Sequence, residues 1–543
     1  MKPRAGKLIA AGALVAGTVT VLPGPASAAE PGPTTRPVTS PTWTDCGTLA
    51  YPKLQCATLK VPLNHDDPAG RKISLALTRI AHTAAAYQGP LLVNPGGPGG
   101  SGRGLAGYVA AMLPAKVIAQ YDVIGFDPRG VGKSEPALDC LPGYFDPVRP
   151  DSVPRGAEGE KANLERARSF AKACGDKYAD ILPYIDTVST ARDMDAVRRA
   201  LGAPRLNYLG YSYGTYLGAV YARLYPERVR RMALDSVVDP RGVWYEDNIA
   251  QNHAFDARHK AFAAWVARHD DVYRLGTNPE NVEAAWYRMR DELLAKPAAG
   301  KVGASELEDT FLPGGYYDGY WPALAAAFSA YAVDHDSAPL VKAYEKHGAA
   351  DAAADNGYSV YTSVQCRDAQ WPKKWGVWRE DAWNTYAKAP FYTWNNTWYN
   401  APCAFWPVPS LTPPDVTNDQ LPPTLILQAT NDAATPFEGA AALHRMVRRS
   451  SLVVEQGGGN HGVTLGGNDC MDDHLITYLA TGEVPRGAEG AEADAFCERL
   501  PEPTPYPEPA KQGAASEDAA PTGATGASGS PGATLHGVLG HEH

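Results

Sequence analysis

A serine stands between two glycines in the run 208–214, which reads Tyr-Leu-Gly-Tyr-Ser-Tyr-Gly. A short apolar segment, 206–209, leads into this run, and a segment with helical character, 215–224, follows it. A strand, a tight turn carrying Gly-x-Ser-x-Gly and a helix, in this order, are typical of a nucleophile elbow. Only glycine fits the turn at Gly210 and Gly214, where a Cβ would clash. The motif predicts that Ser212 is the nucleophile of an acyl-transfer reaction.

A serine hydroxyl is a weak nucleophile at neutral pH, so it needs a histidine base and a carboxylate that orients the histidine. Chains with a nucleophile elbow supply the acid and then the histidine later in the sequence, from loops that follow strands. Asp432 follows the apolar run 423–428, and His461 follows the apolar run 452–454. The order and the strand-end positions predict a triad of Ser212, Asp432 and His461.

Two other residues compete for these roles. Asp235 lies within the preceding predicted strand and is the alternative acid, and His474 lies in a helical window and is the alternative base. Asp432 can also serve only to cap the helix that Pro436 opens, as aspartates before helices often do. The chain order favours Asp432 and His461 over both alternatives.

A glycine-rich loop at 94–102, Asn-Pro-Gly-Gly-Pro-Gly-Gly-Ser-Gly, follows the apolar run 91–93. Such a loop brings backbone N–H groups close to a developing oxyanion. We expect the oxyanion hole to consist of the amides of Gly97 and Tyr213, with Gly96 as the alternative to Gly97. No Lys-Ser/Thr pair follows the loop, which disfavours a phosphate-binding role.

Apolar strand patterns at 73–80, 91–93, 123–126, 206–209 and 231–238 alternate with helical patterns. Such alternation predicts an α/β fold with a mostly parallel sheet covered by helices on both faces. From 241 to 418 the pattern is helical and rich in aromatic residues, which predicts a cap inserted before the acid-bearing strand of an α/β-hydrolase fold. The predicted segments are a signal peptide (1–28), a disordered lead-in or propeptide (29–45), the first part of the core (46–240), the helical cap (241–418), the second part of the core (419–500) and a disordered tail (501–543).

The first 28 residues combine a basic start, an apolar stretch and an Ala-Ser-Ala cleavage site, so we expect export and an extracellular location. No later segment offers an apolar span, and no membrane association is expected after export. The chain has 50 Lys and Arg against 60 Asp and Glu, a net charge of −10, which argues against nucleic acid as a partner.

The eight cysteines, an even number in an exported chain, predict disulfides rather than ligands, and none has the two-residue spacing of zinc ligands. No metal and no organic cofactor is expected. Pairing of sequence neighbours gives the bridges Cys46–Cys56, Cys140–Cys174, Cys366–Cys403 and Cys470–Cys497.

The motifs at 94–102, 125–132, 206–216, 432–436 and 460–464 together resemble those of the secreted bacterial tripeptidyl aminopeptidases, relatives of the prolyl aminopeptidases. The resemblance extends from about residue 43 to residue 497. It implies an α/β-hydrolase exopeptidase that removes short peptides, typically tripeptides, from free N-termini. It places the nucleophile at Ser212, the acid at Asp432 and the base at His461. Prolyl aminopeptidases usually begin the glycine loop with histidine, whereas this chain has Asn94.

A free N-terminus requires an acidic anchor. Asp318 and Asp368 in the predicted cap are the candidates, and Gln365 stands where we expect relatives to have an acidic residue. The same triad also suits a carboxylesterase or amidase that acts on small molecules, because acyl transfer does not determine the leaving group. A hydrolase fold without activity that serves for binding is the third hypothesis.

Overall fold

The computed structural model describes residues 40–488, 492–506 and 530–539. The predicted signal peptide and most of the predicted lead-in lie outside these ranges. The described strands form one ten-stranded sheet in the order β1-β2-β3-β5-β4-β6-β7-β8-β9-β10. The strands are β1 (Thr44–Asp45), β2 (Gln55–Pro62), β3 (Lys72–Ile80), β4 (Pro90–Asn94), β5 (Asp122–Phe126), β6 (Leu206–Tyr211), β7 (Val229–Asp235), β8 (Thr424–Ala429), β9 (Ser450–Gln456) and β10 (Ala495–Glu498).

The sheet is parallel from β5 to β10 and antiparallel from β1 through β3 to β5. The central strands β4, β5, β6 and β8 are buried along their whole length, as their apolar sequences predict. Since β6, β8 and β9 run in the same direction, the loops that follow them meet at one edge of the sheet.

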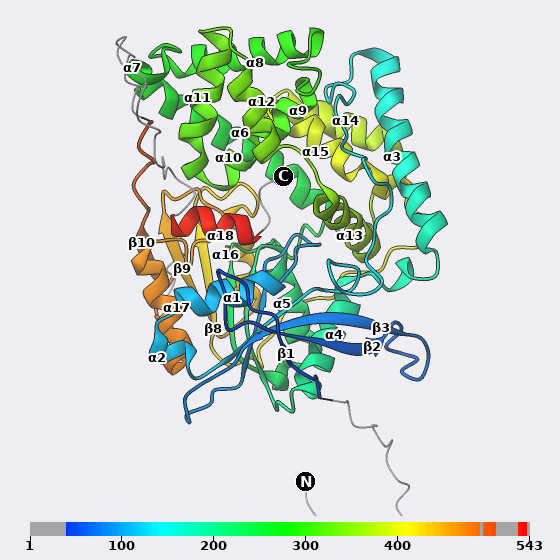
Figure 1. Cartoon of the computed structure of the whole chain (residues 1–543), viewed down its shortest axis with the longest axis vertical. Helices are drawn as coiled ribbons and strands as arrows, with labels where there is room; N and C mark the ends of the chain where they lie inside the picture. The colour runs from blue at the N-terminus through cyan, green and yellow to red at the C-terminus, as the bar shows by residue number, and fades with distance from the viewer. Residues whose placement is uncertain (1–39, 489–491, 507–529, 540–543) are drawn as a thin grey trace, which may run out of the picture. The chain divides into compact units, whose positions relative to one another are not determined.

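Helices cover both faces of the sheet (Figure 1). On one face α1 (Arg103–Met112) and α17 (Asp469–Thr481) share a hydrophobic core with alternate residues of the strands, such as Leu91 and Leu209. On the other face α5 (Tyr213–Leu224) packs on Tyr208 and Leu234 through Gly218, with α4 (Thr187–Ala200) beside it. The short helices α2 (Ala115–Ile118) and η2 (Pro226–Arg228) and the longer α16 (Phe437–Met446) complete the core.

Between β7 and β8 the described chain forms helices and no sheet strand, which confirms the predicted helical insertion. A core of large aromatic side chains, including Trp265, Trp286 and Trp321, holds it together. Its helices are α6 (Tyr245–Arg268), α7 (Asp270–Tyr273), α8 (Pro279–Ala295), α9 (Ala304–Phe311), α10 (Pro313–Tyr316), η3 (Asp318–Tyr320), α11 (Trp321–Ala332), α12 (Ala338–His347), α13 (Ala352–Asp368), α14 (Trp375–Tyr386), α15 (Thr393–Asn400) and η4 (Ala401–Phe405).

A second insertion lies between β5 and β6, in a segment that the sequence predicted to belong to the core. It contains α3 (Gly156–Tyr178) and η1 (Leu182–Tyr184), and Figure 1 shows α3 beside α14 and α15 of the cap. Arg149 in this insertion forms an ion pair of 2.9 Å with Glu306 of α9, and Trp398 Nε1 donates to Ser152 O at 2.6 Å. The cap is therefore assembled from two segments of the chain, one before the nucleophile and one after it.

All four predicted disulfides are present in the described residues: Cys46–Cys56, Cys140–Cys174, Cys366–Cys403 and Cys470–Cys497. Bridges of this number are characteristic of proteins from oxidising compartments. Within the same residues, no helix is long and apolar enough to cross a membrane.

The tail differs from its prediction. Residues 501–543 were expected to be disordered, yet α18 (Pro531–Leu539) forms a helix with Leu535, His536 and Leu539 buried. Proline and the glycines in this segment gave no helical pattern, so tertiary packing, rather than local propensity, orders it.

Candidate active site

The loop between β6 and α5 holds Ser212 in a strained conformation. Its φ of 55° and ψ of −129° lie in a region that residues other than glycine rarely adopt. The Ser212 N–H donates to Asp235 O at 3.0 Å, and Thr215 donates from its N–H and its hydroxyl to Ser212 O, at 2.8 and 2.7 Å. A Cβ on Gly210 would lie 2.5 Å from Gly214 O. These contacts form the predicted elbow.

Asp432 and His461 meet in the loops that follow β8 and β9. His461 Nδ1 lies 2.8 Å from Asp432 Oδ2 and 3.0 Å from Oδ1, and both side chains are fully buried. Asp432 Oδ1 also accepts the N–H groups of Ala434 (2.9 Å) and Thr435 (3.0 Å). Asp432 therefore pairs with the imidazole and closes the turn that precedes α16. The N-cap of α16 is Pro436, with no side-chain cap hydrogen bond, so the alternative in which Asp432 only caps this helix is wrong.

Thr435 is part of this arrangement, although the sequence did not single it out. Its hydroxyl donates to Asp432 Oδ2 at 2.9 Å and lies 3.2 Å from His461 Nδ1. On the cap side, Tyr316 packs edge-on against the His461 ring with centroids 5.5 Å apart, and its carbonyl accepts the His461 N–H at 2.8 Å. The imidazole is thus held by the core on one side and by the cap on the other.

Asp235, the alternative acid, connects the loop of Ser212 to the loop of His461. Its carbonyl accepts the Ser212 N–H, while its carboxylate accepts the N–H of Val463 at 2.9 Å and the N–H of Thr464 at 2.8 Å. Burial raises the pKa of this carboxyl to about 6. Because its oxygens are occupied by the backbone of the histidine loop, the geometry supports a positioning role.

The glycine loop after β4 lies directly against the elbow. Gly96 has φ +99°, and a Cβ there would lie 2.6 Å from Tyr211 O and 2.9 Å from Ser212 Cβ. The Gly96 N–H donates to Asn94 Oδ1 at 3.0 Å, so the amide of Gly97 is the better placed of the two for an oxyanion. A Cβ on Gly99 would lie 2.4 Å from Gly357 O in α13, so this loop also touches the cap.

Asp318, the first candidate anchor, begins η3 beside the histidine loop. Its N–H donates to Asn460 Oδ1 at 2.9 Å, and it lines a cavity of about 220 Å³ together with Arg258, Arg268 and Arg499. Burial raises the pKa of its carboxyl, and the charge of Arg258 acts in the opposite direction. The cavity around this carboxylate thus contains three arginines as well as Glu455 and Glu502.

Asp368, the second candidate anchor, lies under the elbow. Its oxygens accept the Thr187 N–H at 2.8 Å and the Thr187 hydroxyl at 2.5 Å, and the Thr187 hydroxyl in turn lies 2.7 Å from the Tyr213 hydroxyl. Burial raises the pKa of this carboxyl to about 7. Both oxygens are engaged within the protein, so this geometry favours support of Tyr213 over capture of a substrate ammonium group.

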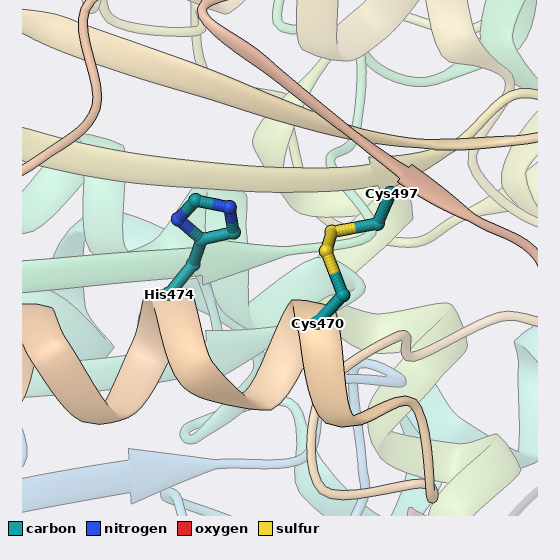
Figure 2. Close-up of side chains that lie close together, drawn as sticks. All are labelled: Cys470, His474 and Cys497. Carbon is teal, nitrogen blue, oxygen red and sulfur yellow. A yellow bond between two sulfur atoms is a disulfide. The ribbon is translucent and has the colours of Figure 1, made fainter.

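His474, the alternative base, lies on α17, the helix that follows the His461 loop, beside a disulfide. Figure 2 shows its imidazole near Cys470 and Cys497. The ligand atoms of these three residues lie within 4.8 Å of one another, which is the spacing of a metal site. The two sulfurs are bonded to each other, however, and a metal requires free thiolates. This group is therefore a disulfide with a neighbouring histidine.

Comparison with known proteins identifies two family models in the chain. The model described as alpha/beta hydrolase fold matches residues 89–341, and the model described as TAP-like protein matches residues 389–497. The second match contains both Asp432 and His461.

Three curated proteins are similar over most of their length. A tripeptidyl aminopeptidase of Streptomyces lividans is 43% identical over 455 residues, which cover 81% of this chain and 84% of that protein. The serine protease Hip1 of Mycobacterium tuberculosis is 31% identical, with coverage of 88% and 95%. Carboxylesterase B of the same organism is 32% identical, with coverage of 89% and 97%.

Proposed function

Because the chain belongs to the tripeptidyl aminopeptidase family of α/β-hydrolase serine peptidases, we propose that it releases short peptides, chiefly tripeptides, from free N-termini. Ser212 is the nucleophile, His461 the general base and Asp432 the acid of this proposal. The pairing of His461 with Asp432 in a fully buried site is the observation that carries it.

The reaction proceeds through an acyl-enzyme. The Ser212 hydroxyl attacks the scissile carbonyl and gives its proton to His461 Nε2, while Asp432 stabilises the imidazolium. The amides of Gly97 and Tyr213 stabilise the oxyanion. His461 then returns the proton to the leaving amine, and a water molecule, activated by the same imidazole, hydrolyses the ester to regenerate Ser212.

We further propose that the protein works outside the cytoplasm. The four disulfides support this location, since they persist in oxidising compartments. The substrates are then extracellular peptides.

A second candidate is a carboxylesterase that uses the same triad on small esters. The similarity to a protein named carboxylesterase B favours it, because the chain covers nearly all of that protein. The chemistry at Ser212 is common to both functions, so only the choice of substrate separates them.

A release assay separates the two candidates. Free and N-acetylated tripeptide nitroanilides, single-residue nitroanilides and short-chain nitrophenyl esters are offered to the native chain and to Ser212→Ala. We expect cleavage of the free tripeptide substrate, little cleavage of its acetylated form and a loss of about 10⁴-fold or more in the variant. Ester turnover without peptide cleavage would replace the first function by the second. Full activity of Ser212→Ala would remove the mechanism for both.

A further inference from the structure

Helix α18 lies on the loop that carries His461. Leu535 and Leu539 are buried in the same hydrophobic cluster as Tyr211, Val463 and Leu465. A Cβ on Gly462, the residue after the histidine, would lie 3.1 Å from Leu539 Cδ1 and 3.5 Å from Leu535 Cδ2. Figure 1 shows α18 at the ends of the strands, between the sheet and the cap helix α10.

The polar side chain on the buried face of α18 points toward the same region. His536 is 1% exposed and stacks on Tyr317 with ring centroids 4.6 Å apart. Burial, and then the charge on His461, lower the pKa of His536 to about 3. A neutral imidazole from α18 therefore lies within electrostatic range of the catalytic imidazole.

The start of α18 is attached to both sides of the site. Ser530 Oγ lies 3.2 Å from the hydroxyl of Tyr317, which belongs to the cap. The Tyr108 hydroxyl, on α1 of the core, donates to Pro531 O at 3.0 Å. Residues 530–539 thus bridge the cap and the core next to His461.

Helix α18 is not expected to be stable without its tertiary contacts. It spans nine residues, two of which are Gly532 and Gly537, and isolated helices of this length are unstable in water. Its order depends on the surface under it, so a modest loss of contact would release it.

His461 has to meet the leaving amine to protonate it. In the structure its side chain is fully buried, with α18 packed over the residue that follows it. If the leaving part of a substrate passes over the histidine loop, an apolar segment that holds this position competes with it. The surface formed by Tyr108, Tyr211, Tyr317 and Leu465 suits such a segment.

We propose that residues 530–539 are an inhibitory segment that binds in cis to this apolar surface beside His461 and keeps the enzyme latent until the segment is displaced or cut away. The inference rests on the proposed peptidase function, because it assigns a regulator to that site. The occupant of the surface is this chain's own α18.

The test uses the full chain with Leu535→Asp, which places a charge on the buried face. The matched control is Thr534→Asp, which adds the same charge at the neighbouring exposed position of the helix. If the open form is a minor population, Leu535→Asp raises kcat/KM for the free tripeptide substrate about tenfold or more, and Thr534→Asp leaves it unchanged. Equal kcat/KM in all three proteins, or a loss of activity in Leu535→Asp with the fold intact by circular dichroism, would overturn the proposal.

A second variant keeps every buried side chain and carries a specific protease sequence within 507–529. Cutting after folding should activate the enzyme to the level of Leu535→Asp, and a synthetic peptide of residues 530–543 should inhibit it again. Binding of the same peptide to Leu535→Asp combined with Ser212→Ala, measured by calorimetry, does not depend on catalysis. If no form of the protein cleaves a peptide substrate but the synthetic peptide 530–543 binds, the proposed peptidase function fails, while the binding of α18 to this surface is supported. If the protein cleaves peptides, but the synthetic peptide does not bind and cutting does not activate the enzyme, only the proposal of an inhibitory segment fails.

Discussion

Asp235 accepts two hydrogen bonds from Thr464, one from its backbone N–H at 2.8 Å and one from its hydroxyl. Through this pair the end of β7 sets the position of the loop that contains His461. The carboxylate of Asp235 therefore serves to position this loop, although its location next to Ser212, the proposed nucleophile, would also suit a catalytic acid.

Replacing this carboxylate should therefore affect stability first. In Asp235→Ala the donors of Val463 and Thr464 lose their acceptor in a buried site, and we expect the free energy of unfolding to fall by about 2–4 kcal/mol. The rate constant kcat should also fall, because the histidine loop loses its support. Urea denaturation and steady-state kinetics measure both. A loss of about 10⁴-fold in kcat without loss of stability would instead make Asp235 the catalytic acid.

The glycine loop 94–102, which carries the proposed oxyanion hole, offers a test with a matched glycine. Gly96→Ala would bring a methyl group within 2.9 Å of Ser212 Cβ, whereas a methyl group on Gly104 meets no atom within 4 Å. We expect kcat to fall by about 10²-fold or more in Gly96→Ala, since the amides at the oxyanion move away from the elbow. Gly104→Ala, in α1, should keep native kcat and gain a little helix stability. Native activity in Gly96→Ala would contradict the proposed oxyanion hole.

Asp368 should make the stability depend on pH. Burial raises the pKa of its carboxyl to about 7, so between about pH 4 and pH 7 the folded state holds a proton that the unfolded state has released. The stability it contributes is therefore complete below about pH 4 and falls as the pH rises to about 7, by up to about 4 kcal/mol.

Chemical denaturation across this range, compared between the native chain and Asp368→Asn, isolates the effect. The difference in the free energy of unfolding between the two proteins should change with pH between about pH 4 and pH 7 and be constant outside this range. The exposed Asp419, changed to Asn, is the control and should leave the slope as it is. An unchanged slope in Asp368→Asn would show that this carboxyl titrates normally.

The Cys470–Cys497 bridge should contribute stability without a role in catalysis or metal binding. It closes a loop with a sequence separation of 27, and its replacement by two alanines should cost about 3–4 kcal/mol of stability. Zinc should not raise the melting temperature of the oxidised native protein. A rise of the melting temperature with zinc in the absence of reductant would instead support a metal site that includes His474.

The main fold could be predicted because it rests on local patterns, and the proposed triad rests on patterns of the same kind. Apolar runs mark the buried strands, and Ser212, Asp432 and His461 each follow such a run in the order that the elbow requires. The disulfides follow from proximity in the sequence, since each pair lies in one local region.

The features that escaped prediction depend on contacts between distant segments. The sequence shows Asp235 only as the last residue of a predicted strand. Its positioning role depends on hydrogen bonds from the distant loop 462–464. Helix α3 is mostly polar and buries few side chains, such as Phe170, against a partner surface from another part of the cap. Helix α18 contains glycine and proline and is specified by the surface on which it packs.

The contact between Gly99 and Gly357 concerns the evolution and engineering of this enzyme. The backbone of the glycine loop 94–102 contacts the backbone of α13 there, and a Cβ on Gly99 would lie 2.4 Å from Gly357 O. Asn356, the neighbour of Gly357, also binds the core through Gly130 O at 2.9 Å. A cap from a relative could replace this one only if its helix at the position of α13 also left room for the backbone at Gly99. The cap and the glycine loop therefore have to change together.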